Sequence, residues 1–414
     1  MVFHPVHPAS TPGLGQAGGR GTPSRRVGQR PCTGAPAEPW AFGKTEGSVL
    51  QCVIVRTARP GDHGPMTADP PDPAALGTTL RPAGVGITSH PAGAGANLAP
   101  GAAGASPDLR PIDATELAHL QRWQGRTEVR SDMLHAAPVR GLSATLDRAD
   151  PEPVPGSVLP PLWHWLYFLP QSRHSEIGPD GHPRRGGFLP PVPLPRRMWA
   201  GGRLHWQAGN PLRVGDAVER RSCIASVSHK TGRIGDLLFV LLRHELHNAA
   251  GLALTEEHDI VYRSAARPGD PQPAPQAAPA GAAWQRELLP DEVLLFRYSA
   301  LTFNGHRIHY DRRYANAVEG YPGLIVHGPL IATLLLDLLR REMPEARLAR
   351  FEFRAVRPAF DLNPLRLNGQ PEADGCSADG DGSRRVSRDG SRRINLWAQD
   401  HEGWLTMQGL ATLA

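Results

Sequence analysis

The sequence predicts an α+β protein made of two similar halves, each an antiparallel sheet that wraps one helix. Three observations lead to this fold class. An apolar, helix-like segment followed by β-prone runs occurs twice, beginning at residues 160–170 and again at residues 330–339. A Pro/Ala-rich linker, residues 267–284, separates the two occurrences. Short turns join the β-prone runs, which favours antiparallel pairing. This order is typical of a tandem, or double, hot-dog fold, in which each sheet curls around a central helix.

The first part of the chain, residues 1–108, is dominated by Gly, Pro, Ala, Ser and Thr, with one plausible strand at Ser48–Arg56. A segment of this composition buries too little apolar surface to offset the conformational entropy it would lose on folding. We therefore expect disorder here, or a translation start that lies downstream of the first methionine.

The first hot-dog domain is expected at residues 109–266. Helical apolar spacing starts at DATELAHLQRW, residues 113–123. The run PPLWHWLYFLP, residues 160–170, is interpreted as an apolar aromatic helix bounded by prolines, and a Pro/Arg/Gly loop follows at residues 183–203. Three long β-prone runs complete the domain. The turns between these runs fall at residues 230–232 and 249–251.

The second hot-dog domain is expected at residues 285–414. A strand is predicted at Glu292–Phe303, and a polar loop connects it to Leu330–Leu339, which is apolar nearly all round and is therefore expected to be a buried helix. A Gly/Asp/Arg-rich loop is expected at residues 374–393. The remaining strands are predicted at residues 349–356, 361–367, 393–399 and 404–413.

Charge and composition limit the partners and the location of the chain. The net charge of +5 and the pI of about 9.3 permit an anionic partner without choosing one. No run approaches the roughly 18 apolar residues of a membrane span, and the first thirty residues lack the apolar core of a secretion signal. The four cysteines stand far apart with no CxxC pair, so we expect neither a disulfide framework nor a zinc site. We predict a cytoplasmic protein that binds no membrane and no nucleic acid.

The polar loop of the second half carries the chemistry. Asn304 and His309 stand five positions apart, and Asp311 follows. Downstream, Gly328 and Pro329 open the apolar helix, where free backbone N–H groups and the positive end of the helix dipole can stabilise an oxyanion. Pro329 at the first turn loses no needed donor.

This loop resembles the type-2 enoyl-CoA hydratase motif of the MaoC family, in which an acidic residue and a His five positions later hold a water. His309 matches the His and Asp311 the trailing acid, while Asn304 stands where most members carry Asp. The same change is typical of the branch that includes the mitochondrial 3-hydroxyacyl-thioester dehydratases. Residues 160–170, 180–203 and 256–263 also resemble the 3-methylfumaryl-CoA (mesaconyl-CoA) hydratases. The resemblance covers residues 111–414.

The resemblance implies a hydro-lyase that adds water reversibly to an α,β-unsaturated CoA thioester, with 3-methylfumaryl-CoA giving citramalyl-CoA. It also implies that no cofactor is needed, because CoA is part of the substrate. We assign His309 as the proton carrier, since imidazole titrates near neutral pH. Asn304 is expected to orient the water, and the Gly328 N–H to stabilise the enolate. A second proton donor remains open.

Arginine and histidine side chains supply further candidate site residues. Five arginines are candidates for the CoA phosphates or a substrate carboxylate, because a planar guanidinium suits an oxyanion. They are Arg197, Arg203, Arg307, Arg312 and Arg313. A metal site from His306, His309 and Asp311 is conceivable by residue type, but the family uses none and we predict none. We interpret His306 as an exposed bystander, extend that interpretation to His327, and expect His244 and His247 on the exposed face of a strand.

The same sequence features are also compatible with other functions. The same chemistry run in reverse would make the chain a dehydratase of 3-hydroxyacyl thioesters, carried on CoA or on acyl carrier protein. A fatty acyl chain would need an apolar tunnel, whereas a dicarboxylate needs a buried cation. A non-catalytic acyl-CoA-binding protein would treat Asn304 as a disabling change, although His309 and the Gly-Pro helix start argue against it. A hot-dog thioesterase is a weaker candidate. A homodimer is an open expectation.

Overall fold

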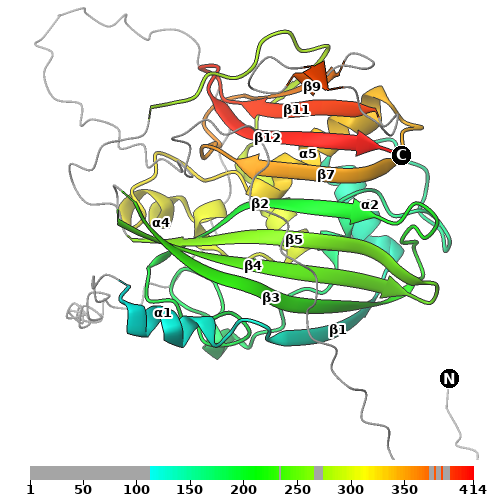
Figure 1. Cartoon of the computed structure of the whole chain (residues 1–414). Helices are drawn as coiled ribbons and strands as arrows, with labels where there is room; N and C mark the ends of the chain where they lie inside the picture. Colours follow the sequence, from blue (N-terminus) through cyan, green and yellow to red (C-terminus); the bar gives the residue numbers. More distant parts are fainter. Residues whose placement is uncertain (1–111, 233–234, 265–273, 373–376, 379–383, 386–391) are drawn as a thin grey trace, which may run out of the picture. The chain divides into compact units, whose positions relative to one another are not determined.

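The computed structural model describes residues 112–232, 235–264, 274–372, 377–378, 384–385 and 392–414 (Figure 1). The N-terminal segment 1–108 with its candidate strand, part of the linker 267–284, and most of the loop 374–393 lie outside the described residues. The domain boundaries predicted above therefore stay predictions.

One antiparallel sheet of ten strands dominates the described part, in the order β1-β3-β4-β5-β2-β7-β12-β11-β8-β6. A separate two-stranded ribbon pairs β9 (Ser377–Ala378) with β10 (Arg384–Arg385). The ten strands are β1 (Thr127–Met133), β2 (Arg196–Trp206), β3 (Ala217–Gly232), β4 (Gly235–Asn248), β5 (Gly251–Arg263), β6 (Trp284–Leu288), β7 (Leu348–Ala355), β8 (Leu365–Pro371), β11 (Arg393–Gln399) and β12 (Leu405–Leu413).

The two halves of the sheet share one strand order. In the first half the earliest strand, β1, lies at the outer edge and the second, β2, at the centre of the full sheet. In the second half β6 and β7 take the same places. β2 and β7 pair antiparallel from Gly201↔Arg354 to His205↔Arg350, which joins the halves into one continuous sheet. A repeated unit joined at a central antiparallel pair matches the predicted tandem arrangement.

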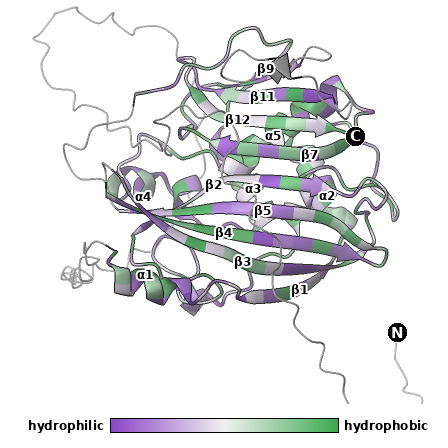
Figure 2. Ribbon diagram, in the orientation of Figure 1, coloured by the Kyte–Doolittle hydropathy of each residue, from purple (hydrophilic) through white to green (hydrophobic). Residues whose placement is uncertain are grey.

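The long helix α5 (Gly328–Glu342) confirms the predicted buried helix of the second half. It packs against β6, β8, β11 and β12, and every residue from Leu330 to Leu339 is buried. Figure 2 shows hydrophobic and hydrophilic residues interspersed along the strands, as expected of a sheet with one face on a core and the other on solvent. Along β4, for example, buried and half-buried positions alternate. The helix therefore fills the space on the apolar side of the sheet.

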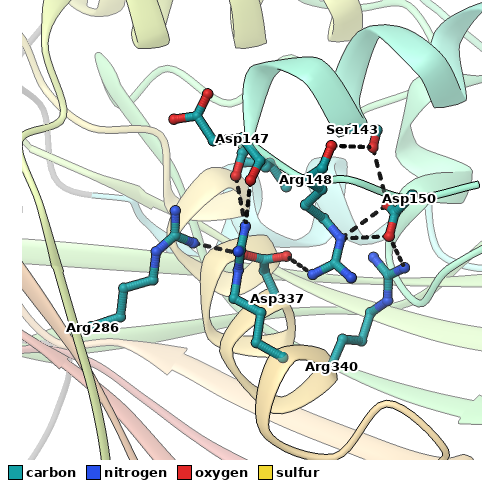
Figure 3. A network of polar contacts seen from close by, with 9 residues as sticks. Ser143, Asp147, Arg148, Asp150, Arg286, Asp337 and Arg340 are labelled. Atoms are coloured by element: carbon teal, nitrogen blue, oxygen red, sulfur yellow. Dashed lines mark hydrogen bonds and ion pairs between the residues drawn. The ribbon is translucent and has the colours of Figure 1, made fainter.

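Asp337 is the polar exception on α5, and it ties the two halves together (Figure 3). Its side chain is 1% exposed and accepts hydrogen bonds from Arg148 at 2.6 Å and Arg286 at 2.7 Å. Arg341, one turn later on α5, contacts the same carboxylate at 2.8 Å. Arg148 follows helix α2 (Ala136–Thr145) of the first half and also pairs with Asp150. A buried carboxylate without partners raises the free energy of the folded state, so these contacts favour a single relative orientation of the two halves.

The predicted strand at residues 292–303 is wrong, because the segment forms helix α3 (Glu292–Thr302). The Asp291 side chain accepts a hydrogen bond from the Leu294 N–H and caps the helix. Leu295, Tyr298 and Ser299 are buried, which is the spacing of one helical face. The β-prone composition was therefore overridden by a cap and by tertiary packing.

The aromatic run at residues 160–170 is also not the helix that we predicted. It contains one short 3₁₀ turn, Trp163–Leu166, because Leu162 and Phe168 adopt left-handed backbone angles with φ of 68° and 56°. Its Trp163, Leu166 and Tyr167 side chains are still buried in the main core. Part of the expected loop 183–203 is strand β2, and β1 and β6 were not predicted.

The remaining elements are short and complete the chain. The predicted helix near residue 113 is α1 (Ala114–Gln121), with Asp113 as its cap. One-turn segments occur at His174–Glu176 and Arg307–His309, and α4 spans Arg312–Ala317. No helix in the described residues is long and apolar enough to cross a membrane.

Candidate active site

The polar loop between α3 and α5 is held in a defined conformation. Phe303 ends α3 with a left-handed φ of 49°, and the Asn304 N–H donates to the Ser299 carbonyl at 2.8 Å. The Asn304 Oδ1 accepts a hydrogen bond from the His306 N–H at 3.0 Å. Asp311 accepts from the Tyr314 N–H as the cap of α4 and pairs with Arg307 at 2.6 Å. Asp311 therefore has a local structural role.

His309 is buried and held in one orientation. It is 8% exposed, and its Nδ1 lies 2.7 Å from the carbonyl oxygen of Ile325. Because a carbonyl only accepts, Nδ1 carries the proton and the neutral ring keeps its lone pair on Nε2. The pKa of His309 is lowered to about 4, chiefly by burial. The hydrogen bond to the Ile325 carbonyl raises this pKa, and His182 acts to lower it. At neutral pH the ring is therefore a free base.

His327 belongs to this site, so its interpretation as a bystander is wrong. It is fully buried and stacks on His309, with ring centroids 3.7 Å apart and an interplanar angle of 19°. Its Nε2 lies 2.8 Å from the Ser299 Oγ, whereas its Nδ1 has no hydrogen-bond partner among the described residues. Burial, then the neighbouring His309 and His306, hold the pKa of His327 well below its usual value.

His306 is likewise not a solvent-exposed residue. Its ring meets His309 edge-on at 5.4 Å and lies 4.0 Å from the ring of His182. Burial, together with His182 and His309, lowers the pKa of His306 to about 2. His182 in turn contacts Asp180, with Nδ1 and Oδ2 3.0 Å apart. The first half of the chain thus contributes a loop to the site in the second half.

Two backbone contacts lock this first-half loop onto the site loop. The Arg307 N–H donates to the Asp180 carbonyl at 2.9 Å. Gly181 has a φ of 90°, and a side chain there would collide with the Gly305 carbonyl oxygen. Glycine is required because it alone tolerates both that angle and that close approach. Spacing along the sequence gave no sign of this contact.

The first residue of α5 is not crowded by its neighbours. Gly328 is its first helical residue, and a Cβ at that position would meet only the Met407 Cε, 4.0 Å away. The first N–H groups of a helix have no acceptor within the helix. The Gly328 N–H, which we predicted as the oxyanion donor, directly follows His327 in the chain, and the His327 ring stacks on His309.

The five candidate arginines differ in their partners. Arg203 pairs with Glu257 at 2.7 Å and Asp259 at 2.8 Å. Arg312 is held by Glu292 and the buried Asp361. Arg307 pairs with Asp311 and lies over the Tyr314 ring.

Arg313 is exposed, and Arg197 is half-buried on β2. The positive charge of Arg197 acts to lower the pKa of both His182 and His306.

One group of side chains could hold a metal ion by residue type. The ligand atoms of Asp180, His182 and His306 lie within 4.8 Å of one another, which differs from the set considered from the sequence. Arg197 and Arg185 both act to lower the pKa of His182. Because these fixed positive charges oppose a further cation, the group is poorly suited to a metal.

Comparison with known proteins places the chain in a family. Residues 162–361 match the model of hydroxyacyl-thioester dehydratase type 2. A mesaconyl-C(4)-CoA hydratase of Chloroflexus aurantiacus is 48% identical over 255 residues, which cover 61% of this chain and 89% of the relative. The chain belongs to the hydroxyacyl-thioester dehydratase type 2 family. A mitochondrial member from Schizosaccharomyces pombe is 28% identical over 58% of this chain and 88% of its own length.

Membership of this family makes the chain an enzyme, a hydro-lyase. A solved MaoC-like dehydratase matches 70% of this chain and 98% of its own, with a TM-score of 0.51 and 14% identity, which is a likeness of fold. The predicted α+β double hot-dog class is confirmed by this likeness together with the strand order of the sheet.

Proposed function

We propose that this enzyme hydrates 3-methylfumaryl-CoA, also called mesaconyl-C4-CoA, to citramalyl-CoA. The observation that carries the proposal is the 48% identity to a mesaconyl-C(4)-CoA hydratase across 89% of that relative. The geometry around His309 supports it, because a buried neutral imidazole is what the reaction needs.

The proposed reaction uses His309 for both proton transfers. Its Nε2 takes a proton from water, and the resulting hydroxide adds to the β-carbon of the enoyl thioester. The electron pair of the double bond moves to the thioester oxygen and forms an enolate. Collapse of the enolate returns the proton from His309 to the α-carbon, so water is added without gain or loss of atoms. General acid–base groups of this kind contribute about a hundred- to ten-thousand-fold in rate.

Backbone and amide groups complete the proposed mechanism. The Gly328 N–H and the positive end of α5 would stabilise the enolate oxygen, where charge develops in the transition state. Asn304 would orient the water but cannot exchange a proton at neutral pH. No step in this scheme requires a cofactor.

A dehydratase acting on 3-hydroxyacyl thioesters is the second candidate, favoured by the similarity to the mitochondrial type 2 dehydratase. The reverse of the steps above would serve that reaction. The two candidates differ in the acyl group, not in the role of His309.

A panel of CoA esters tests the assignment. Purified protein is mixed with 3-methylfumaryl-CoA, crotonyl-CoA and longer enoyl-CoAs, and the loss of the conjugated thioester absorbance is followed. We expect the methylfumaryl ester to react fastest. Turnover of the other esters without the methylfumaryl ester would replace the proposal by the dehydratase. Binding without turnover of any ester would favour an acyl-CoA-binding protein.

We expect a homodimer in the cytoplasm. Light scattering on the purified chain tests the first expectation, and fractionation of cells that express it tests the second.

A further inference from the structure

We propose that His327 and Ser299 position the base His309, His327 through ring stacking and Ser299 through its hydrogen bond to His327. Both are positioning residues, because they act through His309 and need not touch the substrate. The inference rests on the proposed role of His309 and extends it. It applies equally to hydration and to dehydration, since the two candidate reactions use the same base.

Two contacts fix the His309 ring. Its Nδ1 lies 2.7 Å from the Ile325 carbonyl oxygen, which sets the tautomer and the direction of one edge of the ring. One hydrogen bond still lets the ring plane tilt, because it weakens steeply only at large deviations from linearity. The His327 ring limits this tilt, since its centroid lies 3.7 Å from that of His309 at an interplanar angle of 19°. The Nε2 lone pair of His309, which must meet the water, is therefore held in one direction.

The His327 ring is itself held in place by helix α3. It is fully buried, and its Nε2 lies 2.8 Å from the Ser299 Oγ. Its Nδ1 has no hydrogen-bond partner among the described residues, so within them the bond to Ser299 is the one that restrains rotation of the ring. The Tyr298 ring packs against it at 5.1 Å and 63°. Ser299 is thus the polar anchor of the ring that supports the base.

Ser299 also connects His327 to the rest of the site. Its carbonyl accepts a hydrogen bond from the Asn304 N–H at 2.8 Å, while its hydroxyl contacts His327. His327 precedes α5, and its carbonyl accepts from the Ile331 N–H at 3.0 Å. The Gly328 N–H, the proposed oxyanion donor, comes next in the chain. A shift of His327 would therefore displace both the support of the base and the oxyanion donor.

The proposed reaction requires that His327 remain uncharged. His309 becomes an imidazolium when it takes the proton from water. A second positive charge on a ring stacked at 3.7 Å would oppose this step, because like charges repel strongly in a buried site. Burial first, and then His309 and His306, hold the pKa of His327 well below its usual value. The stacked ring is therefore a flat, neutral support at the pH of the reaction.

A second buried Ser–His pair provides a matched control. In the first half, the Ser222 Oγ lies 2.8 Å from the His244 Nδ1, and both residues are buried. The His244 ring meets His258 edge-on at 4.7 Å. Removing the hydroxyl of Ser222 or of Ser299 takes away the same kind of bond. A difference in turnover between the two variants would therefore come from the place of the pair in the molecule and not from the lost bond as such.

Four variants and the control test the proposal. They are Ser299→Ala, His327→Phe, the double variant that combines these two, His327→Leu, and Ser222→Ala as the control. Ser299→Ala keeps the carbonyl that holds Asn304. Phenylalanine keeps a flat ring for stacking but lacks the ring nitrogens, whereas leucine keeps an apolar side chain without a ring. Steady-state kinetics on the preferred CoA ester give kcat, and competition experiments give the dissociation constant of that ester.

We expect His327→Leu to lower kcat by about a hundred-fold, the usual loss when a reacting group is misplaced by about 1 Å. Ser299→Ala and His327→Phe should each lower kcat by about two- to tenfold, the range for one lost neutral hydrogen bond. The double variant should be no slower than His327→Phe, because Ser299 acts through His327. Affinity for the ester should stay close to that of the wild type in every variant. Ser222→Ala should keep its kcat.

Stability is measured alongside turnover. Circular dichroism and thermal melting check that each variant is folded. If His327→Leu does not fold, then Ser299→Ala, His327→Phe and their double variant decide the result, because the non-additive losses are expected of those three. The kcat of His327→Phe also tests the stack directly in a folded His327→Leu background of comparison, since only the flat ring distinguishes the two substitutions in the proposed role.

The outcomes separate this inference from the proposed function. If His309→Ala remains active, the base assignment and the positioning role fail together. If His309→Ala is inactive but His327→Leu and Ser299→Ala keep full kcat, His309 stands as the base and the positioning role is wrong. Three other results would also overturn the positioning role: equal losses of kcat in Ser222→Ala and Ser299→Ala, a His327→Phe variant as slow as His327→Leu, or losses of ester affinity in place of kcat.

Discussion

Two groups of buried or half-buried histidines in this enzyme differ in whether a carboxylate contacts their rings. In the first half, His164 and His258 contact the Glu256 carboxylate at 2.9 Å and 2.6 Å, and Trp165 donates to it at 2.7 Å. Glu256 is 2% exposed. His244 joins the same group through an edge-on contact with His258 and a 2.8 Å hydrogen bond to Ser222. We call these residues the Glu256 group.

In the second half, His309 and His327 contact a carbonyl and a hydroxyl instead. Burial alone would raise the pKa of Glu256, but His258 and His164 hold it well below its usual value. A carboxylate so placed keeps a charge and fixes its neighbours. His309 has a lowered pKa and keeps an available lone pair. The comparison teaches that one half holds a buried charge and the other a buried neutral base, and we propose a structural role for the charge and a catalytic role for the base.

Removing the carboxylate should break the Glu256 group and give the largest effect. Glu256→Ala leaves two imidazoles and an indole N–H without their acceptor, and loss of one partner from a buried charged network costs about 3–5 kcal/mol. Urea unfolding measures this loss. Glu345→Ala, at an exposed site, is the control and should change the free energy of unfolding by less than about 0.5 kcal/mol. A loss below about 1 kcal/mol for Glu256→Ala would contradict a structural role for the group.

Removing the base should affect turnover rather than stability. His309→Ala should lower kcat at least about a hundred-fold, equivalent to about 3 kcal/mol of barrier. Thermal melting should change far less than in Glu256→Ala. His401→Ala, in an exposed turn, is the matched control and should retain full turnover. An active His309→Ala variant would remove the central assignment.

The pH dependence distinguishes a buried base from an ordinary histidine. With a pKa of about 4, His309 stays unprotonated well below pH 6.5, so kcat/KM should stay level to about pH 5 and fall near pH 4. The part of the free energy of unfolding that is linked to the neutral ring is fully present above the unfolded-state pKa of about 6.5. It is lost as the pH falls through the folded-state pKa of His309. Rate profiles and urea unfolding between pH 4 and 8 measure both. An activity midpoint near 6.5 would mean that the ring is not desolvated.

Changes at Asn304 should have the smallest effects. Its Oδ1 accepts from the His306 N–H, and loss of one such bond costs about 1 kcal/mol. Asn304→Ala should therefore lower kcat/KM several-fold or more, because the loop and the water both lose a partner. Asn304→Asp keeps the acceptor and places the carboxylate found in most of the wider family, so it should be tolerated. Steady-state kinetics on the preferred ester compare the two, and equal losses would argue against this acceptor role.

Local sequence patterns predicted those elements whose pattern and environment agree. The helix at residues 330–339 is apolar on all sides and starts after Pro329, so only burial could accommodate it, and it is buried. The strand at residues 393–399 was predicted at its observed bounds. The segment 292–303 was misassigned because its apolar and aromatic residues fit either period. Asp291 before it was the available helix signal.

The sequence by itself determined the tandem arrangement, the family motif and the identity of His309 as the candidate base, because these depend on residues close together in the chain. Only the tertiary structure decided which other groups accompany that base. His327 and Ser299 meet across 28 positions, and Arg307 contacts Pro179 across 128. Local periodicity carries no information about such separations. The burial that makes His306 and His327 neutral, and the carboxylates that occupy Arg203 and Arg312, arise only when the chain folds and brings these separated positions together.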